Sequence, residues 1–587
     1  MVSVLWAAVK RSLVLHPFFF ATFASLSLIS NNLTEIGGEG GRAVLFSLGF
    51  SAIVFAVFWL LTRDSVKAGL SASGAIVLFF SYGHVLNLIE TWNVGIDPSG
   101  LLLVIWAGLF TGWLYWVLRR ARTLKPLSNA LNLVAIALNV FPIYTILTYS
   151  DRPVSIQDLA ADYSQQFQID SASSPTEDPP DIYYIVLDAY ARADVLQELY
   201  NYDNSGFLEA LEARGFHVDD EAMANYTHSE ISMASSLNMN QLTDMPEFLR
   251  AKGSSASEDD IRGMSGDLIK NSALRSFLEE QGYAIIAFDS GYGLTQIRDA
   301  DQYVSSPQID DAGLWQIGIE FMLLDTTLGR EIVGLLGEDA SPHKKLFSAH
   351  RERVLFSLAE LPRLAGNDPQ LEGNDQQQAD NEAQLEGNDQ QQVDNEPQLE
   401  GSDQQQVDND PQQAGGDPRF VFAHIISPHV PFVFGREGEE ISGFDAYTLL
   451  DRGGGNEANV ELYRNQLHYL NSLVLDAIDG ILAAYDEPPI IVLQSDHGSK
   501  VYSAVEHPDS VQMDLQVPIF SARLIPKASE QDYYPGMTPV NTFRQILNLY
   551  FDTELDLEPD RSYILETEGN QTQFVEACVV YSTCDAP

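Results

Sequence analysis

Four apolar runs in this chain end in residues that can bind a metal or take part in catalysis. They are IYYIVL before Asp188, YAIIAF before Asp289, FVFAHIISP before His429, and IIVLQS before Asp496 and His497. Each run is typical of a buried strand, and the carboxyl ends of parallel strands meet at one edge of a sheet. We therefore expect Asp188, His429, Asp496 and His497 to lie close together. We interpret Asp289 as a turn residue.

Carboxylate and imidazole groups are common ligands of divalent ions. A single Asp after a strand is more often a turn residue, and a lone His is more often structural. The adjacent pair Asp496-His497 is more specific, because two polar residues follow a run that must be buried. These residues predict one divalent metal ion. Its identity is left open between Mn, Zn, Mg and Ca.

A candidate nucleophile lies in the segment NYTHSEISMASSL, which begins at Asn225. Polar residues open this segment and a helix-like stretch follows. A hydroxyl at a helix N-terminus lies near free N–H groups and the positive end of the helix dipole, which suits attack on an anionic ester. Ser229 or Ser232 could equally be an ordinary N-cap. The residues alone leave both interpretations open.

The residues that must position these groups follow an alternating pattern. Between residues 181 and 587, short apolar runs alternate with amphipathic stretches such as 262–280 and 459–485. This alternation predicts an α/β domain with a largely parallel sheet. The polar stretch 151–180 before it is predicted to be a linker.

A low-complexity insert interrupts this domain at 366–417. It contains a 14-residue repeat that begins at Leu371, Leu385 and Leu399. The repeat has almost no apolar side chains to bury, so we expect the insert to be disordered.

Residues 1–150 form a separate, apolar region. Five stretches near the ~20 residues needed to cross a bilayer lie within it. They cover residues 12–31, 44–62, 69–89, 101–118 and 128–149. The first is too long for a removable signal peptide, and four more follow it. The region is therefore predicted to be a transmembrane domain of five spans.

The basic residues predict its orientation. Eight Lys or Arg residues lie on the side of the N-terminus, and only Arg42 lies in the alternate loops. The positive-inside rule then places the N-terminus in the cytoplasm. An odd number of spans places everything after Ser150 outside. Because the spans hold no charged pair at mid-membrane, the pattern gives little support to a transporter.

Charge and cysteine content narrow the functional classes further. Residues 1–150 carry a net charge of +4 and the rest a net charge of −53. Such an acidic domain argues against nucleic acid as a partner, because phosphate backbones require a basic surface. Cys578 and Cys584 could pair outside the cytoplasm or remain free thiols.

Four short motifs occur in a familiar order: VLDAY, a hydroxyl-x-x-Ser segment, SPHVPF and SDHGS. In this order they resemble the alkaline-phosphatase superfamily, in its sulfatase-like branch of membrane proteins, which includes lipoteichoic acid synthases and phosphoethanolamine transferases. The resemblance covers roughly residues 181–587 apart from the insert. It implies an α/β domain of the alkaline-phosphatase and sulfatase type with a central, mostly parallel sheet. It also agrees with about five N-terminal spans and an outward-facing catalytic domain.

Site residues also follow from this resemblance. It implies a metal held by Asp188, Ser229, Asp496 and His497, with Ser229 as the nucleophile. Ser229 is preferred to Thr227 because the family has a Ser three places after its nucleophile.

The resemblance also assigns roles to two histidines, and the chain differs from true sulfatases at one motif. It implies that His429 is catalytic and contacts substrate, and that His507 contacts substrate too. Sulfatases mature a Cys or Ser within a C/S-x-P-x-R motif, whereas this chain has Ile231 and Met233 in place of the Pro and Arg. Phosphate-ester chemistry on an unmodified Ser is therefore favoured over true sulfatase activity.

Together these observations predict a membrane-anchored, metal-dependent hydrolase or transferase. It would act on phosphate or sulfate esters of cell-envelope lipids or glycans, through a covalent Ser intermediate. The alternative is a catalytically inactive, sulfatase-like ectodomain that binds an envelope polymer.

Overall fold

The computed structural model describes most of the chain, and the parts that it describes are given by number. They are residues 13–33, 40–90, 98–120, 124–150, 155–167, 169, 179–310, 322–324, 326–336, 342–365, 417–441, 457–501, 516–568 and 571–577. His507, Cys578, Cys584 and all but the last residue of the predicted insert 366–417 lie outside the described residues. The predictions made for them therefore remain predictions.

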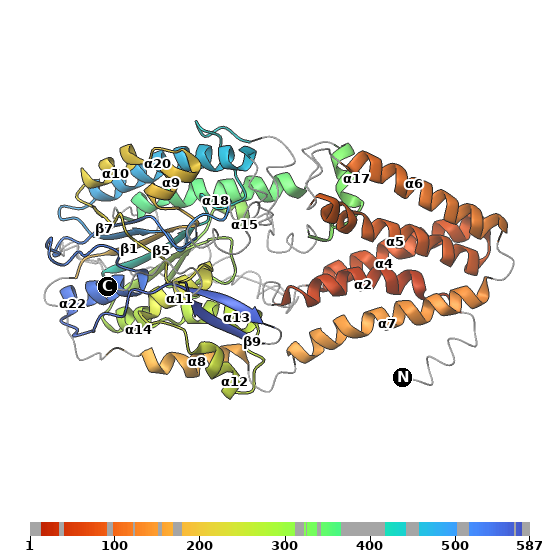
Figure 1. The fold of residues 1–587 in the computed structure, drawn as a ribbon, viewed down its shortest axis with the longest axis horizontal. Helices are drawn as coiled ribbons and strands as arrows, with labels where there is room; N and C mark the ends of the chain where they lie inside the picture. Colours follow the sequence, from red (N-terminus) through yellow and green to blue (C-terminus); the bar gives the residue numbers. More distant parts are fainter. Residues whose placement is uncertain are drawn as a thin grey trace, which may run out of the picture.

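The N-terminal region is a bundle of apolar helices (Figure 1). Its helices are α2 (His16–Ser30), α4 (Gly41–Thr62), α5 (Ser65–Glu90), α6 (Ser99–Tyr115, continued by a π-helical turn Trp116–Arg120) and α7 (Lys125–Ser150). Among the described residues, four helices are long and apolar enough to cross a membrane, and α2 is a shorter apolar helix. The predicted helical membrane region is confirmed, with a first helix shorter than expected.

Buried polar groups join the helices of this bundle. His16 at the start of α2 contacts Ser73 on α5 at 2.5 Å and Ser128 on α7 at 3.1 Å. Asn139 on α7 donates to the carbonyl of Phe19 on α2 at 2.8 Å. Polar groups within membrane helices usually form interhelical hydrogen bonds, and these residues connect α2 to α5 and α7 in this way.

The second region is an α/β domain around one mixed sheet. Its strands are β1 (Ile182–Leu187), β2 (His217–Val218), β3 (Ala284–Phe288), β4 (Gln302–Val304), β5 (Arg419–Ile425), β6 (Ile490–Gln494) and β7 (Ser521–Leu524). Within the described residues the order is β2-β7-β6-β1-β5-β3-β4. The strands β4, β3, β5, β1 and β6 run parallel, and β7 runs antiparallel to β6. The predicted, mostly parallel sheet is confirmed.

Helices cover both faces of this sheet (Figure 1). One face carries α9 (Ala193–Tyr200), α10 (Ser205–Glu212), α15 (Pro307–Asp310), α18 (Pro342–Ala365) and α20 (Glu457–Ala483). The other face carries α8 (Ile156–Ser164, with a 3-10 turn Gln165–Phe167), α11 (Ser229–Asn238), α12 (Met245–Ala251), α13 (Glu258–Lys270), α14 (Ala273–Glu280) and α22 (Pro539–Phe551). A separate hairpin is formed by β8 (Tyr563–Glu568) and β9 (Gln571–Glu576).

The central strand β1 is buried on both of its faces, as its uninterrupted apolar sequence predicts. Tyr183 and Ile185 point into one core, whereas Ile182 and Tyr184 point into the other. Successive strand residues face opposite sides, so an uninterrupted apolar run is what a doubly covered strand requires.

Two segments differ from their predicted form. The predicted linker 151–180 contains α8, which begins at the N-cap Ser155 and packs Leu159 into the core. This part of it therefore belongs to the folded domain. The amphipathic stretch 262–280 is divided between α13 and α14, because the Ser272 hydroxyl accepts the Arg275 N–H and starts a second helix.

Candidate metal and nucleophile site

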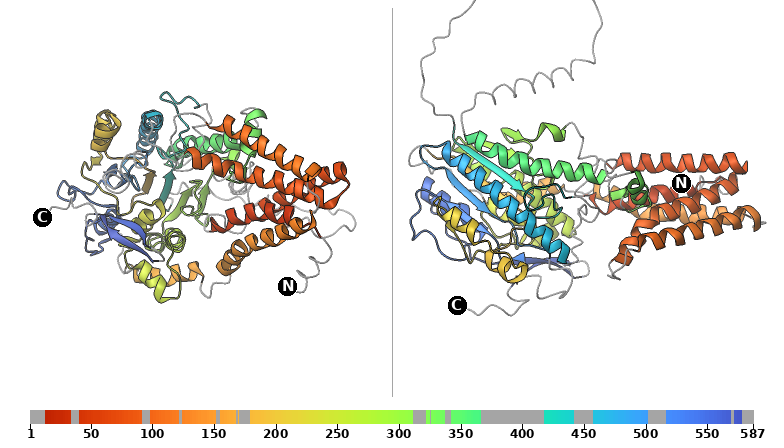
Figure 2. Two further views of the ribbon diagram at one scale, coloured as in Figure 1. Left: turned by 45° about the vertical axis from the view of Figure 1, so that its right-hand side comes forward. Right: turned by 90° about the horizontal axis from the view of Figure 1, so that it is seen from above.

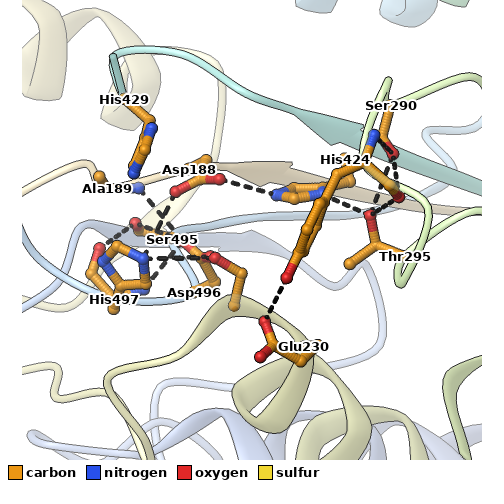
Figure 3. A network of polar contacts seen from close by, with 12 residues as sticks. Asp188, Ala189, Glu230, Ser290, Thr295, His424, His429, Ser495, Asp496 and His497 are labelled. Carbon is orange, nitrogen blue, oxygen red and sulfur yellow. Dashed lines mark hydrogen bonds and ion pairs between the residues drawn. The ribbon is translucent and has the colours of Figure 1, made fainter. Parts of the chain in front are cut away.

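The carboxyl edge of the sheet brings together four of the residues singled out in the sequence (Figure 3). Asp188 follows β1, His429 lies in the loop after β5, and Asp496 and His497 follow β6. The strands β5 and β6 flank β1, and both run parallel to it, so Tyr184 pairs with residues on both sides. The three strands therefore end at the same edge, which places these side chains around one point.

In each of the carboxylates of Asp188 and Asp496, one oxygen has a polar contact and the other oxygen has none. Oδ1 of Asp496 accepts backbone N–H groups from Ala189 at 3.1 Å and His497 at 2.9 Å. Oδ2 of Asp188 lies 3.3 Å from Nε2 of His424. The other oxygens, Oδ1 of Asp188 and Oδ2 of Asp496, have no hydrogen-bond partner within the described part of the chain. Buried carboxylate oxygens are costly to leave without a partner, so a cation is the partner that their charge requires.

The third group of the cluster is the imidazole of His497, which is fully buried. Its Nδ1 lies 2.7 Å from the carbonyl oxygen of Gly498, so Nδ1 carries the proton and Nε2 presents its lone pair. Nε2 lies 3.5 Å from Oδ1 of Asp188 and 3.7 Å from Oδ2 of Asp496. A lone pair beside two free carboxylate oxygens is repulsive without a positive charge between them.

A divalent cation fits this donor set. One ligand atom from each of Asp188, Asp496 and His497 lies within 4.8 Å of the others. The hydrogen bond from Nδ1 of His497 to a backbone carbonyl is the outer-shell contact that orients metal-binding histidines.

The electrostatics of the cluster keep these groups in their metal-binding forms. Burial raises the pKa of Asp188, but the surrounding imidazoles, led by His429, outweigh it and hold that pKa below its usual range. Burial lowers the pKa of His497. Both shifts favour the deprotonated side chains, which are the states that bind cations.

The structure places Ser229 beside this cluster as the first residue of α11. His228 occupies the N-cap position, so Ser229 is not the N-cap. Oγ of Ser229 lies 3.3 Å from Nε2 of His497. The Ser232 hydroxyl instead donates to the backbone carbonyl of Asp496 at 2.8 Å and is buried. Of the two serines, Ser229 therefore faces the cluster and Ser232 fixes α11 to the loop that carries Asp496 and His497.

A buried ion pair fixes the beginning of α11. Glu230 is nearly fully buried, and Arg262 on α13 contacts its Oε1 at 2.5 Å. The hydroxyl of Tyr292 donates to Oε2 of Glu230 at 3.0 Å. Because Arg262 and Tyr292 both bind the Glu230 carboxylate, the neighbouring Ser229 is fixed at the carboxyl edge of the sheet.

His429 lies above Asp188 in Figure 3. Its backbone N–H donates to the carbonyl of Asp188 at 3.0 Å, and its Nδ1 lies 2.6 Å from the carbonyl of Val430. Nδ1 therefore carries a proton, which leaves Nε2 to exchange a second one. The ring centre of His429 is 6.2 Å from that of His497, so His429 borders the cluster without joining it.

Two buried histidines at the site were not singled out in the sequence. His424 lies within β5, with Nδ1 2.9 Å from the Thr295 hydroxyl and Nε2 facing Asp188. His350 lies on α18, and Nε2 has no partner among the described residues. Burial lowers the pKa of His350 to about 3, helped by Arg353 and His429. The only local signal for His424 was a polar residue inside an apolar run, and His350 had none.

Asp289 takes no part in the cluster. It forms an ion pair with Arg353 at 2.9 Å and accepts a hydrogen bond from the Tyr303 hydroxyl at 3.0 Å. It therefore ties α18 and β4 to the end of β3.

Comparison with protein families agrees with this site. The sulfatase family model matches residues 365–550. This range contains His424, His429, Asp496 and His497, and it does not reach Asp188 or Ser229. The predicted resemblance to the sulfatase family is confirmed by this match over residues 365–550. No curated protein matches the chain.

Several solved structures are similar to the chain at low sequence identity. The periplasmic domain of EptC from Escherichia coli, in complex with Zn, is 13% identical with a TM-score of 0.37, and 70% of this chain and 95% of that chain are covered. The integral membrane lipooligosaccharide phosphoethanolamine transferase A (EptA) of Neisseria meningitidis is 13% identical with a TM-score of 0.36, covering 94% of this chain and 95% of that one. A protein of the alkaline phosphatase superfamily from Vibrio parahaemolyticus is 11% identical with a TM-score of 0.36, covering 70% and 80%. Likenesses this low do not transfer an activity.

Fold and site together define the class of protein. The chain is a membrane protein whose α/β domain carries a sulfatase-family segment and a buried Asp and His group suited to a metal.

Proposed function

We propose that this chain is a membrane-anchored, metal-dependent enzyme that transfers or hydrolyses phosphate esters through a covalent intermediate on Ser229. One observation carries the proposal. The unpartnered oxygens of Asp188 and Asp496 and the Nε2 lone pair of His497 surround a point beside Oγ of Ser229. A nucleophile next to a cation site is the arrangement that phosphoryl transfer requires.

Asp188, Asp496 and His497 would hold the cation, with Ser229 as a fourth ligand. A divalent cation bound there lowers the pKa of a coordinated hydroxyl and neutralises charge on the phosphoryl oxygens. Ser229 then attacks phosphorus as its alkoxide, having released its proton to solvent. A new O–P bond forms at Oγ, and the bond from phosphorus to the leaving-group oxygen breaks.

His429 is the proposed proton carrier. Its Nδ1 proton is held by the carbonyl of Val430, so the second proton sits on Nε2 of the imidazolium. That proton goes to the leaving oxygen in the first step. In the second step, neutral His429 takes a proton from an acceptor alcohol or water, which attacks phosphorus. Ser229 then leaves and regains its proton from solvent, so both steps balance.

Phosphate esters are favoured over sulfate esters because of the side chains that follow Ser229. Ile231 and Met233 stand where the maturation motif of sulfatases has Pro and Arg, and both are buried in an apolar core. We propose that Ser229 acts unmodified.

We propose that residues 1–150 anchor the enzyme and that the catalytic domain, 181–587, lies outside the cytoplasm with the N-terminus inside. The substrates are then envelope lipids or glycans. The name of one similar structure makes a lipid ester of phosphoethanolamine the first donor to test. We propose that His507 contacts the substrate, as the resemblance implies.

A hydrolysis panel on the full chain in nanodiscs tests the proposal. The substrates are nitrophenyl phosphate mono- and diesters and nitrophenyl sulfate, each with Mn²⁺, Zn²⁺, Mg²⁺ or Ca²⁺. Metal-dependent phosphoester turnover that falls at least about 10³-fold in Ser229→Ala supports it. The matched control is Ser205→Ala, because Ser205 is also the first residue of a helix, α10, and is exposed.

Two results would oppose the proposal. Turnover of sulfate in preference to phosphate would reverse the assignment of the ester. Absence of all turnover, together with no retained metal, would favour the alternative of an inactive ectodomain that binds an envelope polymer.

A further inference from the structure

Part of the catalytic domain is inserted among the membrane helices. We call residues 322–324 and 326–336, which lie between β4 and α18 and include α17 (Gly329–Leu336), the docking segment. Leu323 is only 4% exposed and packs with apolar residues of α2, α4 and α5. Leu328 packs against Tyr82 and Leu86 of α5 and Leu102 of α6. Figure 1 shows α17 lying against the end of the bundle that faces the domain.

Hydrogen bonds accompany these apolar contacts. The backbone N–H of Leu328 donates to the carbonyl of Phe79 on α5 at 2.8 Å. The Tyr82 hydroxyl lies 3.2 Å from Oε1 of Glu331 and 3.1 Å from the carbonyl of Ser99. Ser99 is the first residue of α6, so these contacts lie at the end of the bundle from which α7 leads into the domain. Polar and apolar contacts together mark a specific interface.

A glycine allows the docking segment to turn. A Cβ atom at Gly329 would lie 2.5 Å from Cδ1 of Leu324 and 2.9 Å from Oγ1 of Thr327. The Thr327 hydroxyl is buried and accepts the Gly329 N–H at 3.1 Å. The turn before α17 is therefore closely packed.

The docking segment leads directly into the helix that borders the site. The C-terminal end of α18 lies at the start of β5, because Arg419 donates to the carbonyl of Leu364. Its N-terminal half lies at the carboxyl edge of the sheet, because Arg353 forms an ion pair at 2.9 Å with Asp289, which follows β3, and β3 is parallel to β5. The helix α18 is thus antiparallel to β5, and its start, next to the docking segment, lies at the carboxyl edge of the sheet. Figure 2 shows α18 starting near the bundle and running away from it.

We infer that the docking segment is a positioning element that seats the carboxyl edge of the sheet over the outer end of the bundle, so that the site acts on an ester held in the bilayer. This inference rests on the proposed function. Its positioning residues are Leu323, Leu328 and Glu331 on the domain, with Tyr82 as their partner on α5. None of them touches the metal and nucleophile cluster, so they act on access and orientation and not on the chemical step.

A comparison of two probes tests this inference in full-length protein reconstituted into phosphatidylglycerol vesicles. The membrane probe is acyl-labelled fluorescent phosphatidylethanolamine, whose cleavage between phosphorus and the glycerol oxygen releases labelled diacylglycerol. The soluble probe is bis(4-nitrophenyl) phosphate. In Leu328→Glu we expect kcat/KM for the membrane probe to fall at least about tenfold and that for the soluble probe to change by less than about twofold.

Two further variants separate positioning from misfolding. Tyr82→Phe keeps the packing and removes the hydroxyl that bridges Ser99 and Glu331, so it should show the same selective loss in smaller degree. Leu557→Glu is the matched control, because Leu557 is exposed on the domain and should leave both probes unchanged. Equal losses on both probes in Leu328→Glu, or no loss on either, would overturn the inference.

A distance measurement decides the inference even if the proposed function fails and wild type cleaves neither probe. Spin labels are placed at Leu147→Cys on α7 and Leu199→Cys on α9, both exposed positions, with Cys578 and Cys584 replaced by Ser. Pulsed electron paramagnetic resonance should give a narrow distance distribution that broadens in Leu328→Glu and not in Leu557→Glu. A distribution that Leu328→Glu leaves unchanged would show that the docking segment does not seat the domain.

Discussion

Oγ of Ser229 lies 3.3 Å from Nε2 of His497, the same nitrogen that faces the free carboxylate oxygens of Asp188 and Asp496. The Nε2 lone pair can accept the serine proton or bind a cation, but not both. A Ser-His pair would work without metal, whereas a metal site would activate the serine through the ion. The two unpartnered carboxylate oxygens favour the metal.

Removal of metal should abolish phosphoester turnover and lower the melting temperature. In Asp496→Asn the retained metal should fall to background, because one of the two free carboxylate charges is lost. Elemental analysis of the purified protein measures this. Asp289→Asn is the control, since Asp289 also follows a strand of this sheet, β3, but lies outside the cluster and should leave metal content unchanged. Turnover that survives chelation would instead support the Ser-His pair.

His424 should act as a support for Asp188. Replacing it by Ala removes the group 3.3 Å from Oδ2 of Asp188 and should weaken metal binding about 10- to 100-fold. Thr295→Val leaves His424 in place and removes the hydroxyl that contacts its Nδ1, so its effect on metal binding should be smaller. The same hydroxyl also bonds Ser290 and the carbonyl of Tyr292. Competition with a fluorescent chelator gives the affinities. Equal affinities for wild type and His424→Ala would contradict this role.

Removing Arg262 alone from its ion pair with Glu230 should destabilise the domain more than replacing both partners together. Arg262→Met leaves Glu230 buried without its charge partner and should cost about 2–4 kcal/mol in unfolding free energy. The double variant Glu230→Gln, Arg262→Met should recover part of that loss. A double-mutant cycle from denaturant unfolding measures the coupling. Additive effects of the two substitutions would mean that the pair is not coupled.

His350 should make the stability of the domain fall in acid. Its pKa is about 3 in the folded protein against 6.5 for an ordinary histidine, so between these values the unfolded chain binds the extra proton. Stability then rises with pH across this window and is lost as pH falls, by up to about 1.4 kcal/mol per pH unit. His350→Gln should remove that slope. The control is His468→Gln on α20, and the difference in melting temperature between pH 4.5 and 7 is the measurement. Identical differences in wild type and His350→Gln would contradict it.

The sequence by itself predicted the architecture because it follows from local patterns. Uninterrupted apolar runs such as that before Asp188 indicate strands covered on both faces, and the long apolar stretches before Ser150 indicate membrane helices. The pair Asp496-His497 could be predicted for a related reason. Two polar groups after a buried strand are expensive unless a ligand or metal satisfies them.

Only the tertiary structure decided which other groups share the site. His424 faces Asp188 from within β5, and the buried His350 lies on α18. A polar residue inside an apolar run was the only local signal for His424, because contacts between residues far apart in sequence are not written in a local pattern. The fold also gives Ser229 and Ser232 different contacts, since one hydroxyl faces His497 and the other binds a backbone carbonyl. The docking of Leu323 and Leu328 into the bundle was likewise invisible, because an apolar side chain does not indicate which core will bury it. Sequence therefore determined the elements and their exposure to water or lipid, and the packing of distant elements determined the chemistry.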